Sequence, residues 1–390
     1  MPDRDAPAQF VATREGRRDP GAASHPRGYP ARVRLRAIIT PGASAAPAAE
    51  ARLIDRFGRI GTDLRVSLTD RCSLRCTYCM PPEGLPCLPA HRLLSDDEVI
   101  RLITIAVRDL GVTQVRLTGG EPLLRRGLLR ILAATSALRT ASGERPQTAM
   151  TTNGVGLAAC AADLKLAGLD RVNVSLDTLV PSRFARITGK DRLDDVLAGL
   201  AAAAAAGLTP VKINTVLLRG LNDDEAVGLT RWALSHGYQL RFIEQMPLGP
   251  RERWERNTMV TAADILASLS AELSITPAPT AIRGNAPAET WLVSGEEVAA
   301  GFSPEVGIIA SVTRAFCASC NRIRLTADGQ LRSCLFAQDE TDLRGLLRGG
   351  ADDDRIADAW RSAMADKPAG HEIGEDRFTP PARLMSAIGG

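Results

Sequence analysis

The stretch 64–81, LRVSLTDRCSLRCTYCMP, joins a strand-like run to three closely spaced cysteines. Cys72, Cys76 and Cys79 follow the spacing C-x3-C-x2-C. A zinc site usually takes four protein ligands, and its cysteines tend to come in C-x2-C pairs. Three thiolates on one short loop are instead typical of a [4Fe-4S] cluster with one iron that no protein side chain ligates. Zinc with a distant fourth ligand is the alternative for this loop taken alone.

Strand-like and helical segments alternate from residue 63 onward. The expected strands are 63–69, 113–118, 147–152, 170–176, 210–216 and 238–244, and helical patterns separate them near 96–109, 125–138, 157–167, 193–206 and 222–236. Such alternation predicts a parallel sheet built from βαβ units. Six units predict an α/β fold, an incomplete (β/α)6 barrel of the TIM type. The cysteine loop follows the first strand, at the barrel end where catalytic groups lie.

Polar side chains occupy every second position of several expected strands. They are Arg65, Ser67 and Thr69; Gln114, Arg116 and Thr118; Asn173 and Ser175; Lys212 and Asn214. Strands buried on both faces of a parallel sheet are normally apolar throughout. Because the apolar faces must pack against helices, the polar faces should line the lumen. Unpaired cations are costly to bury, so we expect a wet cavity for an anionic ligand.

Composition divides the chain of 390 residues into three parts. Residues 1–50, rich in Pro, Ala and Arg, are expected to be a disordered tail. Residues 51–260 should hold the barrel and 261–390 a smaller α+β domain. The net charge of +3 argues against nucleic acid as a partner. No apolar run of membrane-spanning length and no signal peptide is evident, so we expect a cytoplasmic protein without a membrane partner.

A second cysteine triplet lies in residues 261–390. Cys317, Cys320 and Cys334 follow C-x2-C-x13-C, and Asp328-Gly329 between them predicts a hairpin turn. Clustered cysteines in a chain without a secretion signal indicate metal ligands rather than disulfides. A zinc ribbon that takes a fourth ligand from elsewhere is the alternative. Cys87 and Cys160 are expected to be unligated thiols.

The turn Gly119-Gly120-Glu121-Pro122 follows the second expected strand, where glycine lets the backbone approach a ligand closely. A C-x3-C-x2-C loop and a GGEP turn in a partial barrel resemble the radical S-adenosylmethionine (SAM) superfamily. Further stretches are similar to the GTP 3′,8-cyclases, the molybdenum cofactor biosynthesis protein A family. These are TTNG, VNVSLDTL, VKINTV, LRFIEQMP, FCASCNRIRLTADGQLRSCLF and the terminal Gly389-Gly390.

The resemblance implies a role for each candidate site residue. A first [4Fe-4S] cluster would be held by Cys72, Cys76 and Cys79, and a second by Cys317, Cys320 and Cys334. SAM would contact Tyr78, Gly120, Ser175 and Met246. GTP would contact Arg65, Arg116, Thr151, Lys212, Arg322, Ile323 and Arg324. No catalytic residue is assigned apart from the clusters and the cofactor.

The implied activity is conversion of GTP to (8S)-3′,8-cyclo-7,8-dihydroguanosine 5′-triphosphate, an early step of molybdenum cofactor (molybdopterin) biosynthesis by a radical SAM lyase. The implied partners are a reductant protein, the pyranopterin-forming next enzyme and a second copy of the chain in a homodimer. The terminal Gly-Gly would enter the active site. One departure from the family pattern is Gln114, where a lysine is expected, so this position cannot supply a charge to the triphosphate.

Two other classes stay open from the sequence. A radical SAM enzyme with a second cluster could modify a peptide, although a peptide groove needs fewer phosphate-binding cations. A zinc-binding scaffold without catalysis would be colourless.

Overall fold

The computed structural model describes residues 52–250, 254–279, 283–373 and 378–389. They belong to one compact unit, Pro41–Gly390, and the other unit, Met1–Thr40, lies outside the described residues. The tail expected at 1–50 therefore also lies outside them. None of the helices described is both long and apolar enough to cross a membrane.

Six parallel strands form the barrel, as the sequence predicts. They are β1 (Asp63–Ser67), β2 (Gln114–Thr118), β3 (Gln147–Thr152), β4 (Arg171–Ser175), β5 (Lys212–Thr215) and β6 (Gln239–Ile243), each paired in parallel with the next. The helices between them are α1 (Asp96–Arg108), α2 (Leu128–Ala137), α3 (Ala161–Leu166), α4 (Pro181–Thr188), α5 (Leu193–Ala205) and α6 (Ala226–Ser235). Of these, α4 was not expected from the sequence.

The sheet continues beyond residue 260 at both edges. The strands are β7 (Ser274–Pro277), β8 (Glu289–Ser294), β9 (Glu305–Ile309), β10 (Arg322–Leu325), β11 (Gln330–Arg332) and β12 (Thr341–Asp342). β9 adds in parallel to β6, and β10 adds in parallel to β1. The order of the twelve strands is β12-β11-β10-β1-β2-β3-β4-β5-β6-β9-β8-β7. Residues 261–390 thus share their sheet with the barrel, and the domain boundary at 260 stays a prediction.

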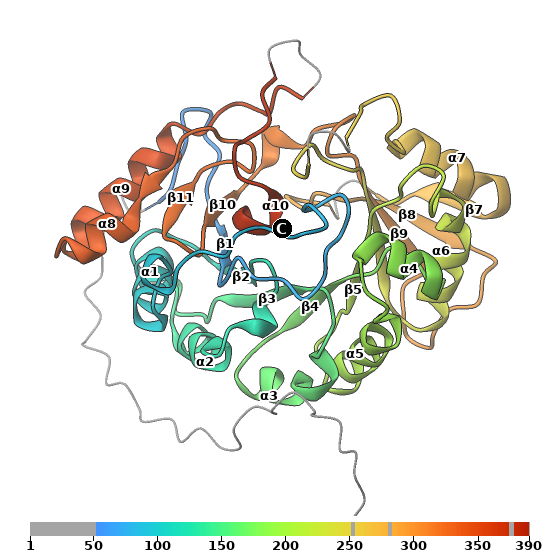
Figure 1. The fold of residues 1–390 in the computed structure, drawn as a ribbon, viewed down its shortest axis with the longest axis horizontal. Helices are drawn as coiled ribbons and strands as arrows, with labels where there is room; N and C mark the ends of the chain where they lie inside the picture. Colours follow the sequence, from blue (N-terminus) through green and yellow to red (C-terminus); the bar gives the residue numbers. More distant parts are fainter. Residues whose placement is uncertain (1–51, 251–253, 280–282, 374–377, 390) are drawn as a thin grey trace, which may run out of the picture. The chain divides into compact units, whose positions relative to one another are not determined.

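Alternating burial confirms the two faces of the strands. In β1, Leu64 and Val66 are fully buried against the helices, while Arg65 faces the other way. Helix α1 begins with a capping box, in which Ser95 Oγ accepts from the backbone N–H of Glu98 and the Glu98 carboxylate accepts from the N–H of Ser95. The covering helices lie outside the ring of strands (Figure 1).

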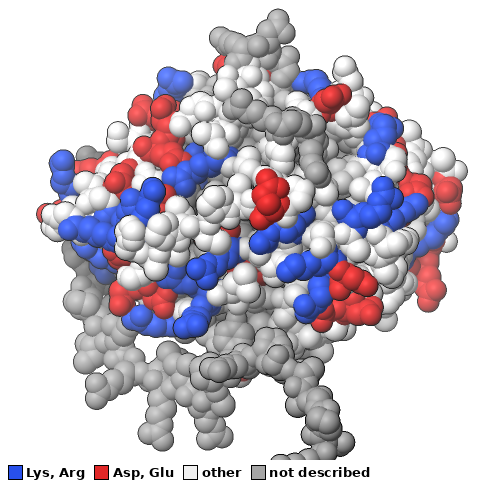
Figure 2. Space-filling view, in the orientation of Figure 1, with Lys and Arg blue, Asp and Glu red and all other residues white. Residues whose placement is uncertain are grey.

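The end of the described chain returns to the middle of the barrel. After α7 (Ala262–Glu272), α8 (Leu343–Arg348) and α9 (Asp353–Ala365), the short helix α10 (Met385–Ile388) lies inside the ring of strands (Figure 1). On the face that looks onto this opening, basic and acidic side chains are interspersed (Figure 2). Positive charge is instead concentrated inside the barrel, among the side chains that line its cavity.

Candidate active site

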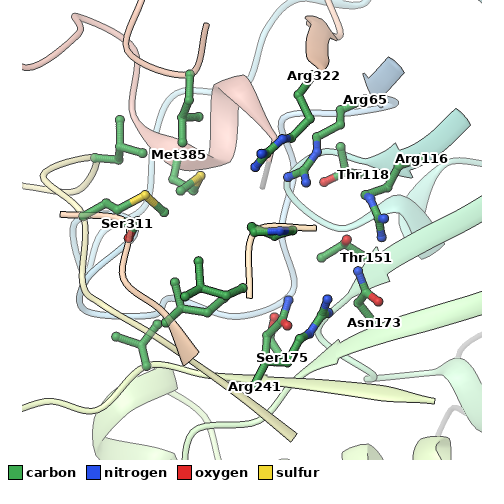
Figure 3. A pocket seen from close by; sticks show the side chains of 18 of the residues that line it. Arg65, Arg116, Thr118, Thr151, Asn173, Ser175, Arg241, Ser311, Arg322 and Met385 are labelled. Atoms are coloured by element: carbon green, nitrogen blue, oxygen red, sulfur yellow. The ribbon is translucent and has the colours of Figure 1, made fainter. Parts of the chain in front are cut away.

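A cavity of about 680 Å³ opens between the C-terminal ends of the strands and the lumen. It contains most of the non-cysteine residues expected to bind SAM or GTP: Arg65, Tyr78, Arg116, Gly120, Thr151, Ser175, Lys212, Met246, Arg322 and Arg324. Arg322, Arg65 and Arg116 point into it from one side, and Met385 and Ser311 lie across from them (Figure 3). The exception is Ile323, which is fully buried on the opposite face of β10, so only its backbone can face a ligand.

The first cysteine loop is held by backbone contacts to α4. The N–H groups of Arg75 and Thr77 donate to the carbonyls of Thr188 and Ile187, at 2.7 and 2.9 Å. The Arg75 guanidinium also donates to the carbonyl of Cys72. Because α4 was not expected from the sequence, this support for the loop was missed as well.

Cys72, Cys76 and Cys79 all line the cavity. Burial raises the pKa of each thiol, to about 12 for Cys79. Buried thiols of this kind lose their protons when a metal supplies positive charge. Among the described residues, no three His, Cys, Asp or Glu side chains converge closely enough for a single metal ion. A [4Fe-4S] cluster binds each cysteine through a different iron, so three cysteines on one loop would leave the fourth iron without a protein ligand.

The Gly-Gly-Glu-Pro turn packs directly against the cysteine loop. A Cβ on Gly120 would lie 2.3 Å from the carbonyl oxygen of Arg71, so only glycine fits there. Glu121 is fully buried and accepts from the N–H of Asn153 at 2.7 Å and from the Thr152 hydroxyl at 2.8 Å. The Asn153 amide donates to Cys72 Sγ at 3.6 Å. Glu121 therefore orients an amide that contacts a cysteine of the first triplet.

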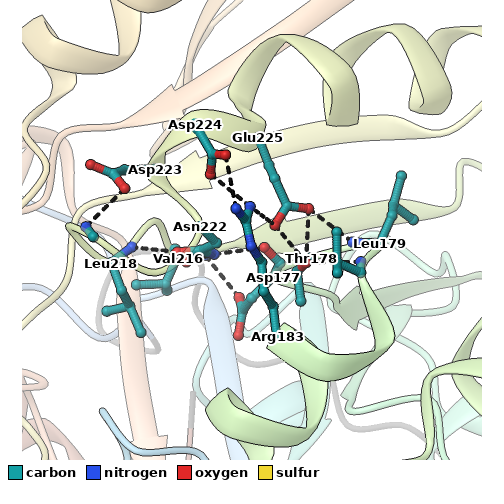
Figure 4. Close-up of polar contacts among 12 residues, drawn as sticks. Asp177, Thr178, Leu179, Arg183, Val216, Leu218, Asn222, Asp223, Asp224 and Glu225 are labelled. Atoms are coloured by element: carbon teal, nitrogen blue, oxygen red, sulfur yellow. Dashed lines mark hydrogen bonds and ion pairs between the residues drawn. The ribbon is translucent and has the colours of Figure 1, made fainter.

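Tyr78 is positioned by Asp177, which belongs to a network of polar contacts at the ends of β4 and β5 (Figure 4). Its hydroxyl donates to Asp177 at 2.8 Å, and the other carboxylate oxygen of Asp177 accepts from the N–H of Val216 at 2.9 Å. Burial raises the pKa of Asp177 to about 6. Asn222 donates to the backbone carbonyl of Asp177 at 2.7 Å. The loop after β5 therefore positions Asp177, and Asp177 in turn positions Tyr78.

The lumen carries an excess of positive charge. The described lining has eight Arg or Lys side chains against three carboxylates. In the register of the sheet, Arg324 of β10 is opposite Arg65 of β1, and Arg65 is opposite Arg116 of β2. Buried guanidinium nitrogens of Arg65 and Arg116 have no hydrogen-bond partner within the described residues.

These cations weaken one another's protonation. Burial and then the charge of Arg65 lower the pKa of Arg116 to about 9. Burial, with the charges of Arg241, Arg171 and Arg116, lowers the pKa of Lys212 to about 8. An anion in the cavity would reverse both effects, because an opposite charge favours the charged form. The lumen therefore suits a polyanion.

The second cysteine triplet lies beside the same cavity. Cys317 interacts electrostatically with both Cys320 and Cys334, and the adjacent Phe316 and Arg322 line the cavity. Burial opposes ionisation of Cys320, but Arg322 and then Lys367 bring its pKa below the usual value. The three thiols are therefore grouped beside basic side chains.

The chain terminus reaches the site. Ser67 donates to the carbonyl of Ile388 at 2.7 Å, and Arg324 donates to the carbonyl of Gly389. A Cβ on Gly389 would lie 2.2 Å from Ser67 Oγ, so a side chain there would collide with the lumen wall. Gly390 lies outside the described residues.

Among the residues that line the cavity, sequence reasoning missed three cations and three carboxylates: Arg171, Arg241, Arg283, Asp63, Asp177 and Glu244. Arg171 and Arg241 occupy the same alternating positions that pointed to Arg65, so applying the pattern to the first residue of β4 and to β6 would have found them. Cys87 is exposed and Cys160 is buried, and neither lines the cavity.

The chain matches two family models. The Radical SAM superfamily covers residues 66–233, and Molybdenum Cofactor Synthesis C covers residues 238–373. With the barrel and the cysteine loop at its mouth, these matches define a radical SAM enzyme.

Curated relatives narrow the class. A GTP 3′,8-cyclase of Mycobacterium sp. (strain KMS) is 61% identical over 338 residues, which cover 87% of this chain and 93% of the relative. A GTP 3′,8-cyclase of Streptomyces coelicolor is 59% identical over 338 residues, covering 87% of this chain and 96% of the relative. The chain belongs to the GTP 3′,8-cyclase family.

Solved structures agree on the fold. Streptococcus suis SuiB bound to S-adenosylmethionine has a TM-score of 0.51 at 16% identity, covering 78% of this chain and 69% of that chain. SuiB bound to its precursor peptide SuiA has a TM-score of 0.52 at 15% identity, covering 83% and 74%. At such identity the likeness concerns the fold alone.

Proposed function

We propose that this enzyme converts GTP to (8S)-3′,8-cyclo-7,8-dihydroguanosine 5′-triphosphate, using SAM and two [4Fe-4S] clusters, at an early step of molybdenum cofactor biosynthesis. The observation that carries the proposal is the row Arg324–Arg65–Arg116 in a cavity that also contains the first cysteine triplet. A nucleoside triphosphate supplies the negative charge that this row lacks, through charge-assisted hydrogen bonds.

Cys72, Cys76 and Cys79 would hold the first cluster, which would supply the electron for reductive cleavage of SAM. The protein contributes position and exclusion of water. The residues that orient SAM are Tyr78, Gly120, Ser175 and Met246. Tyr78 is suited to this because Asp177 fixes its ring, and Gly120 because its backbone lies open beside the cysteine loop.

Cys317, Cys320 and Cys334, next to the cavity-lining Phe316 and Arg322, would hold a second cluster that supplies an open iron for the guanine. Arg322, Ile323 and Arg324 bind the nucleotide there, Ile323 through its backbone. The triphosphate lies along Arg65, Arg116, Thr151 and Lys212. Such placement brings the ribose between the SAM site and the guanine site, where hydrogen transfer from C3′ and bond formation at C8 are both possible.

Gly389 closes the cavity near Ser67. The proposal extends to a cytoplasmic setting, a homodimer, a reductant protein and transfer of the product to the enzyme that completes the pyranopterin. None of the eight cysteines forms a disulfide, which fits a reducing compartment. Peptide modification is disfavoured because the eight basic side chains of the lining suit phosphates better than a peptide backbone.

The test is anaerobic incubation of the reconstituted protein with GTP, SAM and a low-potential reductant, assayed for the cyclic nucleotide and for 5′-deoxyadenosine. We expect both products in the wild-type protein and neither with Cys72→Ala. Formation of 5′-deoxyadenosine with unchanged GTP in the wild-type protein would contradict the proposal.

A further inference from the structure

The row of lumen arginines extends past β2 and β3 to β4. Arg116 of β2 is opposite Ala149 of β3, and Ala149 is opposite Arg171 of β4. Arg324, Arg65, Arg116 and Arg171 therefore share one row, with a single small side chain between the last two. Thr151, two residues after Ala149 on the same strand face, lines the cavity, as do both arginines.

Arg171 is held without being neutralised. Its guanidinium donates to Gln147 Oε1 at 3.2 Å and, more weakly, to Gln114 Oε1 at 3.5 Å. No carboxylate among the described residues forms an ion pair with it. Arginines outside the cavity lining do form such pairs, for example Arg125 with Asp96 and Arg183 with Asp224. Uncharged amide acceptors orient the guanidinium and leave its full charge available to a ligand.

The charge of Arg171 acts on the other lumen cations. It is among the causes that lower the pKa of Arg116, Lys212 and Arg241. Like charges brought together without a counterion destabilise the protein, so this arrangement is favourable when an anion binds among them. Gln114, which carries no charge itself, contributes by positioning Arg171.

We propose that Arg171, oriented by Gln147 and Gln114, binds the terminal phosphate of the substrate and makes the site select a nucleoside triphosphate over the mono- and diphosphate. The inference rests on GTP being the substrate. It makes Arg171 the residue that distinguishes the triphosphate from the shorter nucleotides. Residues Arg171, Gln114 and Gln147 begin their strands, so they lie at the end of the lumen opposite the cysteine loop. A nucleotide whose ribose lies near that loop directs its last phosphate toward them.

The test is equilibrium binding of GTP, GDP and GMP to the reconstituted full-length enzyme under anaerobic conditions. Arg171→Gln should weaken GTP binding by about tenfold or more, as expected for loss of a charge-assisted contact, and GMP binding by less than about twofold. Gln114→Glu, of nearly the same size, places a carboxylate beside Arg171 and should also reduce the preference for GTP. Arg130→Gln removes the same charge from an exposed ion pair with Asp97 on the outside of the barrel and should change neither affinity.

Kinetics separate this role from a structural one. Arg171→Gln should raise KM for GTP with little change in kcat, because a contact to the terminal phosphate is present in both ground and transition states. Unchanged discrimination between GTP and GMP in Arg171→Gln, with active wild-type enzyme, overturns the assignment of Arg171 alone. Absence of GTP binding in the wild-type enzyme overturns the proposed function and this inference with it.

Discussion

Gly249 lies against the backbone of the first cysteine loop, so adding one methyl group there should displace the cluster ligands. A Cβ on Gly249 would lie 2.2 Å from the carbonyl oxygen of Tyr78 and 3.3 Å from the nitrogen of Cys79. Real Cβ contacts essentially never fall under 3.0 Å, so the loop or its neighbour must move by at least 0.8 Å (3.0 − 2.2). Both contacts are backbone atoms, which cannot rotate away as a flexible side chain could.

We therefore expect Gly249→Ala to reduce cyclisation on the order of 100-fold, since displacement of about 1 Å in a catalytic constellation has that effect. Overpacking should also lower the free energy of unfolding by about 1–3 kcal/mol. The assay measures iron per chain, 5′-deoxyadenosine release and thermal unfolding.

The matched control is Gly228→Ala in α6, where no atom lies within 4 Å of the added Cβ. That change should stabilise the helix by about 0.5–1 kcal/mol and leave activity intact. If Gly249→Ala kept wild-type activity and melting temperature, the close packing of residue 249 on the cysteine loop would be refuted.

Three further predictions concern the cations, the second triplet and the junction between β6 and the C-terminal region. GTP affinity should fall by up to about tenfold per pH unit above about pH 8. Burial and neighbouring cations lower the pKa of Lys212 to about 8, so above that pH its side chain is mainly a neutral amine that must take up a proton to bind phosphate. Lys212→Met should bind GTP more weakly at pH 7 and show a flatter pH profile by calorimetry. Cys317→Ala should lose GTP conversion while retaining the iron and the SAM cleavage of the first cluster, and normal cyclisation by this variant would contradict the second site. Glu244 accepts from the backbone N–H groups of Ala262 and Val312 at 2.8 Å each. Glu244→Gln should therefore lower the free energy of unfolding by about 2 kcal/mol in chemical denaturation. Equal stability of this variant and the exposed control Glu272→Gln would show that these hydrogen bonds matter little at the junction.

Local patterns predicted the barrel and much of its lumen. The alternation of Arg65 with Leu64 and Val66 identifies the lumen face directly, because a strand places successive side chains on opposite faces. The spacing of Cys72, Cys76 and Cys79 identifies the cluster loop in the same direct way. Both signals lie within a few residues of one another in the sequence.

Contacts between distant segments could not be predicted in this way. Pairing of β10 with β1 joins residues that are more than 250 positions apart in the chain, for example Arg65 and Arg324. Nothing in the local pattern of either strand specifies that partner. The hydrogen bond from Tyr78 to Asp177 has the same character, since it depends on how the loops after β1 and β4 meet. These contacts turn a polar strand face into an assembled site.

We propose that the cavity brings the ribose of GTP to the SAM site while the guanine lies near the second triplet. Turnover of GTP deuterated at C3′ measures this directly, with mass analysis of the 5′-deoxyadenosine formed. We expect deuterium from C3′ to enter 5′-deoxyadenosine, and we expect GTP deuterated at C8 to transfer none. Unlabelled 5′-deoxyadenosine from C3′-deuterated GTP, with the cyclic product formed normally, would contradict it.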